Sequence, residues 1–255
     1  MEKKKIIGVS MCLVMLATIG LSGCVTEETS NKKIVGTSAD FAPFEFIGEN
    51  QAIVGFDIEM ITAILESKGY EVEVKDIAFD SLITELSTGK IDVITAAMTI
   101  TEEREEQIDF SNAYFEADQS VLIKSDANIT IINSTDLAKY ILGAQTGTTG
   151  AMWVSDTLID EELMADENLK RYETYTLAIL DLKNGNIDAI ILDKPVALAF
   201  EEDANYEVLY TIVTNESYGI GVKEGNTELL EDINQGLADF KDTEEWNTLV
   251  IKYFE

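Results

Sequence analysis

Short apolar runs alternate with helical patterns along the 255 residues, and this alternation limits the possible folds more than any other feature. Strands are expected at residues 34–38, 71–77 and 91–96, and helices at 56–67, 79–87, 227–240 and 244–253. In the helix at 56–67 the apolar residues fall on one face, and Gly69 follows its end. Strands that alternate with helices in this way predict an α/β fold.

A short pattern occurs twice. Residues 89–94 and 185–190 both read Gly-x-Ile-Asp-x-Ile, and each leads from an expected helix into an apolar strand. The repeat indicates two similar lobes, in which Asp92 and Asp188 have a structural role. The candidate crossings between the lobes are residues 121–126 and 214–219, where the chain leaves a strand for a polar stretch.

The expected organisation follows from these features. Lobe 1 comprises residues 34–123 and 215–255, and lobe 2 comprises residues 124–214. A short polar tether at 24–33 precedes lobe 1, and residues 1–23 form an export signal.

The first 24 residues carry the features of that signal. Three lysines precede an apolar run, and Leu-Ser-Gly-Cys24 closes the segment. This ending resembles the lipobox of exported lipoproteins, in which the cysteine becomes the lipidated first residue, so Cys24 is expected to anchor the protein to a membrane. A plain secretory signal or an uncleaved N-terminal helix is the alternative. Cys12 would leave with the signal, so no intramolecular disulfide is expected.

The composition excludes several classes of function. The chain has no histidine and a formal net charge of −30. Without histidine, a Ser-His-Asp, Cys-His or zinc hydrolase is excluded. Nucleic acid and anionic lipid surfaces are poor partners for such an acidic protein, and we expect neither a cofactor nor a metal.

Arginine is rare in this chain. Arg104 lies among acidic residues in the segment MTITEEREEQIDFS, and the only other arginine is Arg171. Taken alone, this spacing favours a surface ion pair with Glu103 or with a neighbour at helical spacing, worth about 0.2–0.5 kcal/mol.

The segments SADFAPFEF, VGFDIEM, MTITEEREEQIDFSNAYF, AQTGTTG, GNIDAIILDKPVA and SYGIGVKEGN change that interpretation. Together they resemble the polar amino-acid branch of the solute-binding proteins that serve ABC importers. The resemblance covers essentially the whole chain after the tether. It implies a monomer of two α/β lobes, a type II periplasmic-binding-protein-like fold with two hinge crossings. A free amino acid would bind in the cleft and be delivered to the importer's membrane subunits.

The resemblance also implies roles for individual residues. The counterpart of Arg104 makes a paired hydrogen bond to the ligand's α-carboxylate, as a planar guanidinium can. The hydroxyls of Thr99 and Thr149 reach the same carboxylate. The backbone carbonyl of Ala97 and the side chain of Asp193 receive the ammonium.

Some of these positions have alternative interpretations. Thr149 would otherwise be a helix N-cap, and Asp193 would otherwise cap the helix that begins near Lys194. Phe41 and Phe79 match the aromatics that enclose the ligand side chain, although isolated aromatics are more often part of a core.

Ser38 bears on the identity of the ligand. Family members that bind lysine, arginine or histidine tend to carry an acid there, so Ser38 favours a neutral polar, glutamine-like ligand, although Asp40 or Asp80 could supply the missing acid. Arg171 falls on an expected lobe 2 edge strand, away from the cleft.

The alternatives for function are a lipoprotein that presents its ligand to a sensor, and a dehydratase or lyase on the same fold. The enzyme would need a general acid or base in the cleft, and none is apparent beyond Asp193.

Overall fold

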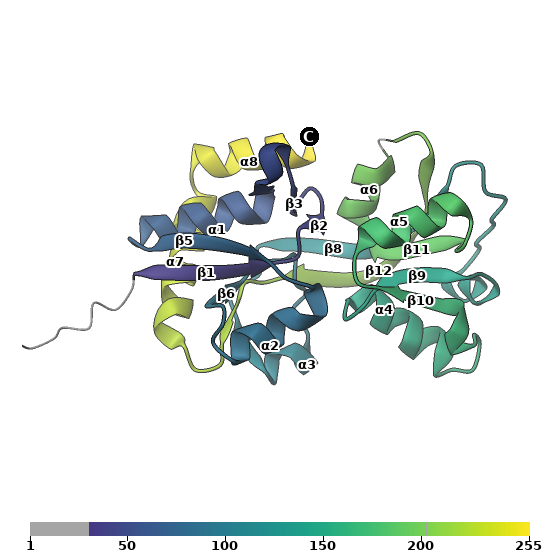
Figure 1. Ribbon diagram of the computed structural model, residues 1–255, viewed down its shortest axis with the longest axis horizontal. Coiled ribbons are helices and arrows are strands. Elements are labelled where there is room, and N and C mark those ends of the chain that lie inside the picture. The colour runs from purple at the N-terminus through teal and green to yellow at the C-terminus, as the bar shows by residue number, and fades with distance from the viewer. Residues whose placement is uncertain (1–30, 202) are drawn as a thin grey trace, which may run out of the picture. The chain divides into compact units, whose positions relative to one another are not determined.

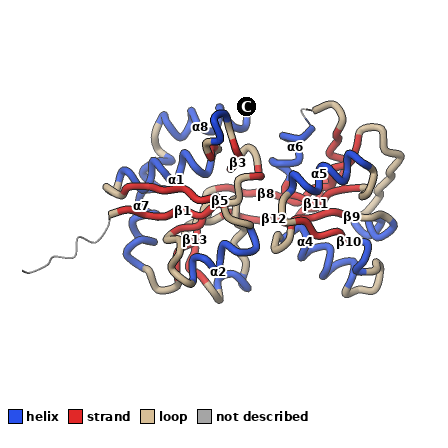
Figure 2. Tube along the Cα trace, in the orientation of Figure 1, coloured by secondary structure: helices blue, strands red, loops and turns tan. Residues whose placement is uncertain are grey.

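The computed structural model describes residues 31–201 and 203–255. Their strands form two five-stranded sheets and one small three-stranded sheet, with helices packed on them (Figures 1 and 2). The expected α/β fold with two lobes is confirmed. The predicted signal and the anchor at Cys24 lie outside the described residues. Within the described ranges, no helix combines the length and apolarity needed to cross a membrane.

The first sheet contains, in spatial order, β5 (Glu71–Asp76), β1 (Lys32–Thr37), β6 (Val93–Ile94), β13 (Gly221–Lys223) and β7 (Ile108–Phe110). β1 is parallel to both of its neighbours, and β13 is antiparallel to both of its own. The small sheet beside it contains β2 (Asp40–Phe41), β3 (Glu45–Ile47) and β4 (Ile53–Val54).

The second sheet contains, in spatial order, β10 (Leu169–Tyr172), β9 (Leu142–Gln145), β11 (Ala189–Asp193), β8 (Phe115–Lys124) and β12 (Tyr206–Tyr218). β9 is parallel to β10 and β11, whereas β8 is antiparallel to β11 and β12. Arg171 lies on the edge strand β10, as expected, and is exposed.

Helices cover both sheets. Around the first sheet lie α1 (Phe56–Ser67), α2 (Leu82–Ser87), α3 (Glu102–Glu105), α7 (Thr227–Lys241), α8 (Glu244–Phe254) and the 3-10 turns η1 (Glu49–Gln51) and η2 (Phe79–Ser81). Around the second lie α4 (Thr149–Val154), α5 (Tyr175–Asn184), α6 (Lys194–Glu201), η3 (Ser134–Lys139), η4 (Ser155–Ile159) and η5 (Asp166–Asn168). Figure 1 shows α1 and α2 on opposite sides of the first sheet, and α5 and α4 on opposite sides of the second.

The repeated Gly-x-Ile-Asp pattern has the same structural use in both sheets. Asp92 accepts a hydrogen bond of 2.8 Å from the backbone N–H of Ile34, and Asp188 accepts one of 2.7 Å from the backbone N–H of Ile141. In each case the carboxylate binds the backbone one residue before the pairing with the adjacent parallel strand begins. The structural role expected for both aspartates is confirmed.

Two strands connect the sheets. β8 pairs with β12 from Phe115 opposite Tyr218 to Lys124 opposite Tyr206, and both pass from one set of elements to the other (Figure 1). The crossing expected near residues 123–124 therefore lies inside the second sheet, where β8 also pairs with β11. We propose that the lobe boundaries lie near residues 114 and 219 instead.

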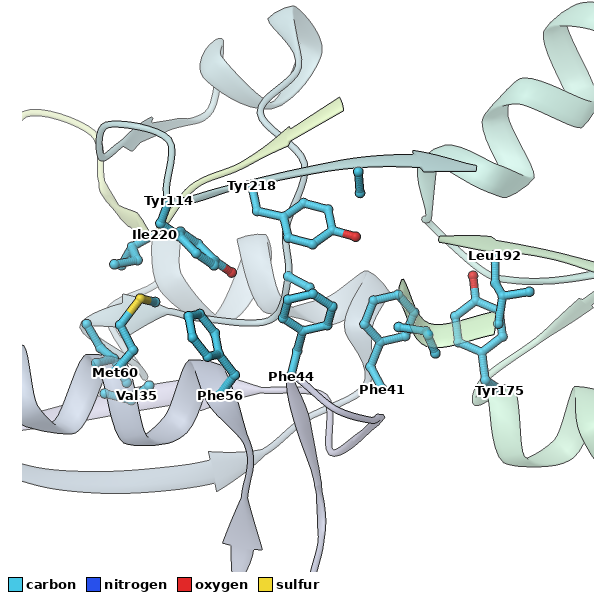
Figure 3. Packing of buried hydrophobic residues seen from close by; sticks show 14 of the residues in the cluster. Val35, Phe41, Phe44, Phe56, Met60, Tyr114, Tyr175, Leu192, Tyr218 and Ile220 are labelled. Carbon is cyan, nitrogen blue, oxygen red and sulfur yellow. The ribbon is translucent and has the colours of Figure 1, made fainter. Parts of the chain in front are cut away.

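Aromatic side chains fill the region between the sheets. Figure 3 shows Phe56, Phe44 and Phe41 in a row that leads toward Tyr175. The ring centroids of Phe44 and Tyr218 lie 5.3 Å apart, and those of Phe41 and Tyr175 lie 5.4 Å apart. Contacts of this kind add stability beyond the burial of apolar area, so the two sheets share part of one core.

The turn before α1 gives a test of this packing. Gly55 has φ +137°, and a Cβ there would lie 2.1 Å from the carbonyl oxygen of Phe44. Gly185, after α5, has φ +73° with nothing within 4 Å of its would-be Cβ. We expect Gly185→Ala to cost about 1 kcal/mol of unfolding free energy through backbone strain alone, and Gly55→Ala to cost at least twice as much. Urea unfolding of both variants measures this, and equal costs would contradict the packing at Phe44.

Candidate functional site

Side chains from segments around both five-stranded sheets line one cavity. Its walls comprise Ser38, Phe41, Glu45, Phe79, Ala96, Ala97, Thr99, Arg104, Gln145, Thr148, Thr149 and Asp193. Every residue that the sequence analysis assigned to ligand binding is among them. Their role in binding stays a prediction, but the fold brings all of them together.

Arg104 is buried, with 4% of its surface exposed, while its acidic neighbours on α3 face solvent. Its guanidinium donates to the carbonyl oxygen of Thr99 at 2.6 Å and to that of Gly147 at 3.0 Å. The alternative of a surface ion pair with Glu103 or a neighbour at helical spacing is therefore wrong. Three of the five guanidinium N–H groups remain for another acceptor. Burial lowers the pKa of Arg104 from its usual value, yet arginine stays protonated in proteins.

Gly147 allows the segment after β9 to lie close to η2. It has φ +80°, and a Cβ there would lie 3.2 Å from the Cβ of Asp80 on η2. The Gly147 carbonyl reaches Arg104 because no side chain separates the two backbones. Arg104 thus bonds to elements of both sheets.

Thr99, which lies between β6 and α3, and Thr149, which begins α4, share one acceptor. Each hydroxyl donates to Oε2 of Glu216 at 2.6 Å, and the two hydroxyl oxygens lie 3.5 Å apart. The alternative of Thr149 as an N-cap is wrong, because Thr148 caps α4 and accepts a hydrogen bond from the N–H of Ala151.

Asp193 ends β11 and is buried. Its carboxylate accepts hydrogen bonds from the side-chain amide of Gln119 and the hydroxyl of Tyr218. Both carboxylate oxygens therefore accept from side chains, which does not support a role for Asp193 in capping α6. Burial raises the pKa of Asp193 to about 7, and the negative charge of Glu216 adds to the shift.

Ala97 has a left-handed backbone, with φ +43°. Its N–H donates to Oδ2 of Asp57 at 2.8 Å, and the same oxygen accepts from the hydroxyl of Tyr114 at 2.5 Å. Non-glycine residues seldom adopt this conformation, which often occurs at functional sites. Burial raises the pKa of Asp57 to about 6.

Aromatic rings form two walls of the cavity. Phe41 packs on Tyr175, and the Arg104 guanidinium carbon lies 5.5 Å from the centre of the Phe79 ring. Beside Phe41, the Ser38 hydroxyl donates to Asp40 at 3.2 Å, and Asp40 accepts from the backbone N–H of Tyr175 at 2.5 Å. Asp40 is therefore a further link between the sheets, and burial raises its pKa.

Sequence reasoning missed Glu45. It lies on β3 with 1% of its surface exposed, lines the cavity, and has no hydrogen-bond partner for either carboxyl oxygen among the described residues. Burial raises its pKa well above the usual value, and the charge of Asp57 adds to the shift. The signal was an acid between two aromatics in PFEF. Glu216 gave no such signal, since it lies in an expected crossing.

A family model for "Bacterial extracellular solute-binding proteins, family 3" matches residues 34–255. The chain belongs to this family. This solute-binding protein is 33% identical to ABC transporter arginine-binding protein 1 of Escherichia coli over 89% of its own length and 93% of the relative. The resemblance seen in its sequence motifs is therefore confirmed.

Solved structures agree with the fold. An ancestral arginine-binding protein bound to arginine matches with a TM-score of 0.82 and 38% identity, covering 88% of this chain and 99% of that one. An ancestral arginine-binding protein bound to glutamine matches with a TM-score of 0.80 and 39% identity, covering 88% and 98%. The relatives of this solute-binding protein are amino-acid-binding proteins, so a two-lobe binding-protein fold is established.

The shifted pKa of Asp193 predicts how stability depends on pH. The folded state keeps a proton that the unfolded state loses above about pH 4, so this group's contribution to stability falls as pH rises toward about 7. Asp193→Asn removes the titration. We expect the unfolding free energy of the variant, relative to the parent, to rise between pH 4 and pH 8 by an amount on the order of 1–4 kcal/mol. Urea unfolding across this range measures the difference, and a constant difference would contradict a raised pKa.

Proposed function

We propose that this solute-binding protein captures a free L-amino acid between its two lobes and delivers it to an ABC importer. One observation carries the proposal: a buried guanidinium and a buried carboxylate line the same cavity, whose walls also contain two phenylalanine rings. A zwitterionic amino acid has the matching pair of charges. The family match, and relatives that are transport binding proteins, support this assignment over an enzyme.

The binding chemistry follows from the donors and acceptors present. The α-carboxylate would take the free N–H groups of Arg104, in the paired geometry that guanidinium favours. The ammonium would lie against the carboxylate of Asp193 and the carbonyl of Ala97. Phe41 and Phe79 would enclose the side chain, while Thr99 and Thr149 flank the carboxylate.

Closure gives the proposed mechanism. Arg104 and Thr99 belong to the first lobe, whereas Asp193 and Thr149 belong to the second. A ligand held by both sets binds the closed form more tightly, because the open form separates them. Ligand therefore shifts the population toward closure.

The side chain that the site accepts depends on Glu45. Among the residues that line the cavity Arg104 is the only cation, whereas Glu45 and Asp193 are acidic and Asp40 lies beside them. After a zwitterion has neutralised Arg104 and Asp193, the buried Glu45 would still have no counter-charge. A cationic, arginine-like side chain supplies one, and relatives named for arginine binding agree.

A neutral, glutamine-like side chain is the second candidate. Ser38 favours it, and the raised pKa of Glu45 allows a protonated carboxyl that could pair with a carboxamide through two hydrogen bonds. One solved structure is of an ancestral arginine-binding protein bound to glutamine.

We also propose that the protein is exported and held at the membrane through lipid on Cys24. The N-terminal sequence pattern supports this location, and the family description as extracellular agrees with it.

Arginine substitutions test the proposed carboxylate site. Arg104→Ala removes the only cation that lines the cavity, so we expect amino-acid affinity to fall about 100-fold or more, as when a buried charge loses its partner. Arg171→Ala is the matched control, because it removes the chain's other arginine from an exposed edge strand. Isothermal titration with arginine, glutamine, lysine and histidine measures both variants. If Arg104→Ala binds as the parent does, the assignment of Arg104 fails.

Glu45 separates the two side-chain classes. Glu45→Gln should weaken arginine binding about 30-fold or more, through loss of a buried charge pair, and change glutamine binding far less. Glu49→Gln, on the exposed turn η1, is the control. Arginine binding near neutral pH should also release more protons than glutamine binding, because Asp193 would lose its proton beside the ammonium of either ligand, whereas Glu45 would lose its proton only beside a cationic side chain. Titration in buffers of different ionisation enthalpy measures the difference. Equal effects on both ligands would contradict a cationic ligand.

A further inference from the structure

Glu216 lies where the two lobes meet, although it does not line the proposed ligand cavity. Its Oε2 accepts the hydroxyl protons of Thr99 and Thr149 at 2.6 Å each. Its Oε1 accepts from the side-chain amide of Gln119 at 3.1 Å. One carboxylate thus connects a residue of the first lobe to two residues of the second.

An irregularity in β12 determines where the Glu216 side chain lies. The pairing with β8 shifts between Ile212 and Glu216, where β12 carries three residues against one on its partner. Asp118 holds the extra loop by accepting the N–H groups of Thr214 and Asn215 at 2.9 and 3.0 Å. Asn215 takes a left-handed conformation, with φ +52°, which asparagine tolerates better than most residues. A bulge of this kind redirects the side chain that follows it.

The hydroxyl groups of Thr99 and Thr149 can donate only a limited number of hydrogen bonds. Each hydroxyl has one proton to donate, and in this structure Glu216 accepts both. The ligand carboxylate expected near Thr99 and Thr149 would have to compete with Glu216 for those protons. The same bonds join the lobes through groups of the protein alone.

We propose that Glu216 is a closure latch: a positioning residue that orients the hydroxyls of Thr99 and Thr149 and holds the two lobes together independently of ligand. The inference rests on the closure step of the proposed function but concerns a residue outside the ligand contacts. Without the Glu216 carboxylate, Thr99 and Thr149 no longer share an acceptor. The closed form then loses these bonds between the lobes, and the population of the open form rises.

Solution scattering tests the latch. The parent, Glu216→Ala and Glu216→Gln are unfolded and refolded to remove carried-over amino acid, and their radii of gyration are compared. We expect Glu216→Ala to have a larger radius than the parent and Glu216→Gln, which keeps one oxygen acceptor, to lie between them. Saturating arginine should bring Glu216→Ala back to the parent's liganded radius. If Glu216→Ala does not refold, Glu216→Gln alone gives the comparison.

Glu116→Ala is the matched control. Glu116 is exposed and lies on β8 opposite Ser217, one residue pair away from Glu216 in the ladder. Its substitution by alanine removes the same charge. An unchanged radius for Glu116→Ala with a larger one for Glu216→Ala supports the latch. Equal radii for Glu216→Ala and the parent overturn it, as does equal expansion of both alanine variants, which would reflect charge rather than specific bonds. The comparison of ligand-free proteins is independent of which amino acid binds, so the latch and the proposed function can fail separately.

Discussion

The antiparallel pairing of β8 with β12 is the constraint on which the rest of the structure depends. It runs through the second sheet and continues to Phe115 opposite Tyr218, where both strands leave for the first sheet. Beyond that pair, Tyr218 accepts the N–H of Tyr114 and Thr99 bridges to Tyr218. The lobes are therefore joined by a two-stranded ladder whose hydrogen bonds leave rotation between them as the easiest large motion.

Polar groups that would be costly to bury in isolation meet beside this ladder. Asp193 accepts hydrogen bonds from Gln119 and Tyr218, and Arg104 donates to two carbonyl groups. The two carbonyl groups bind the Arg104 guanidinium without cancelling its positive charge. Among the described residues, neither carboxyl oxygen of Glu45 has a hydrogen-bond partner. Buried charge without a counter-charge is unfavourable, which is why a ligand that supplies the missing charges would be bound strongly.

Sequence patterns predicted the regular parts of the fold well and the irregular parts poorly. The helix at 56–67 has the predicted limits, because its apolar face and Gly69 define it locally. The strand expected at 91–96 shrinks to Val93–Ile94, since the chain then turns so that Ala97 can donate to Asp57. The first crossing, expected at residues 121–126, overlaps the part of β8 that pairs in the second sheet, because β8 and β12 stay paired as they leave that sheet and no change in composition marks the point.

The residues of the candidate site also divide into those that the sequence could predict and those that it could not. Arg104 and Asp193 could be assigned from sequence because each lies in a motif that resembles the family. Glu216 could not, because its position depends on a bulge held by Asp118, and the residues that make the bulge read as an ordinary polar loop.

The links between the lobes also bear on how long a ligand stays. Arg104 to Gly147, Asp40 to Tyr175 and Glu216 to both threonines are bonds within the protein. All of them must break before the lobes separate, whichever amino acid lies between them. The opening rate of the protein alone would then be an upper limit, common to all ligands, on the rate at which a bound amino acid leaves, and the bonds that each ligand makes across the lobes would lengthen its residence time further.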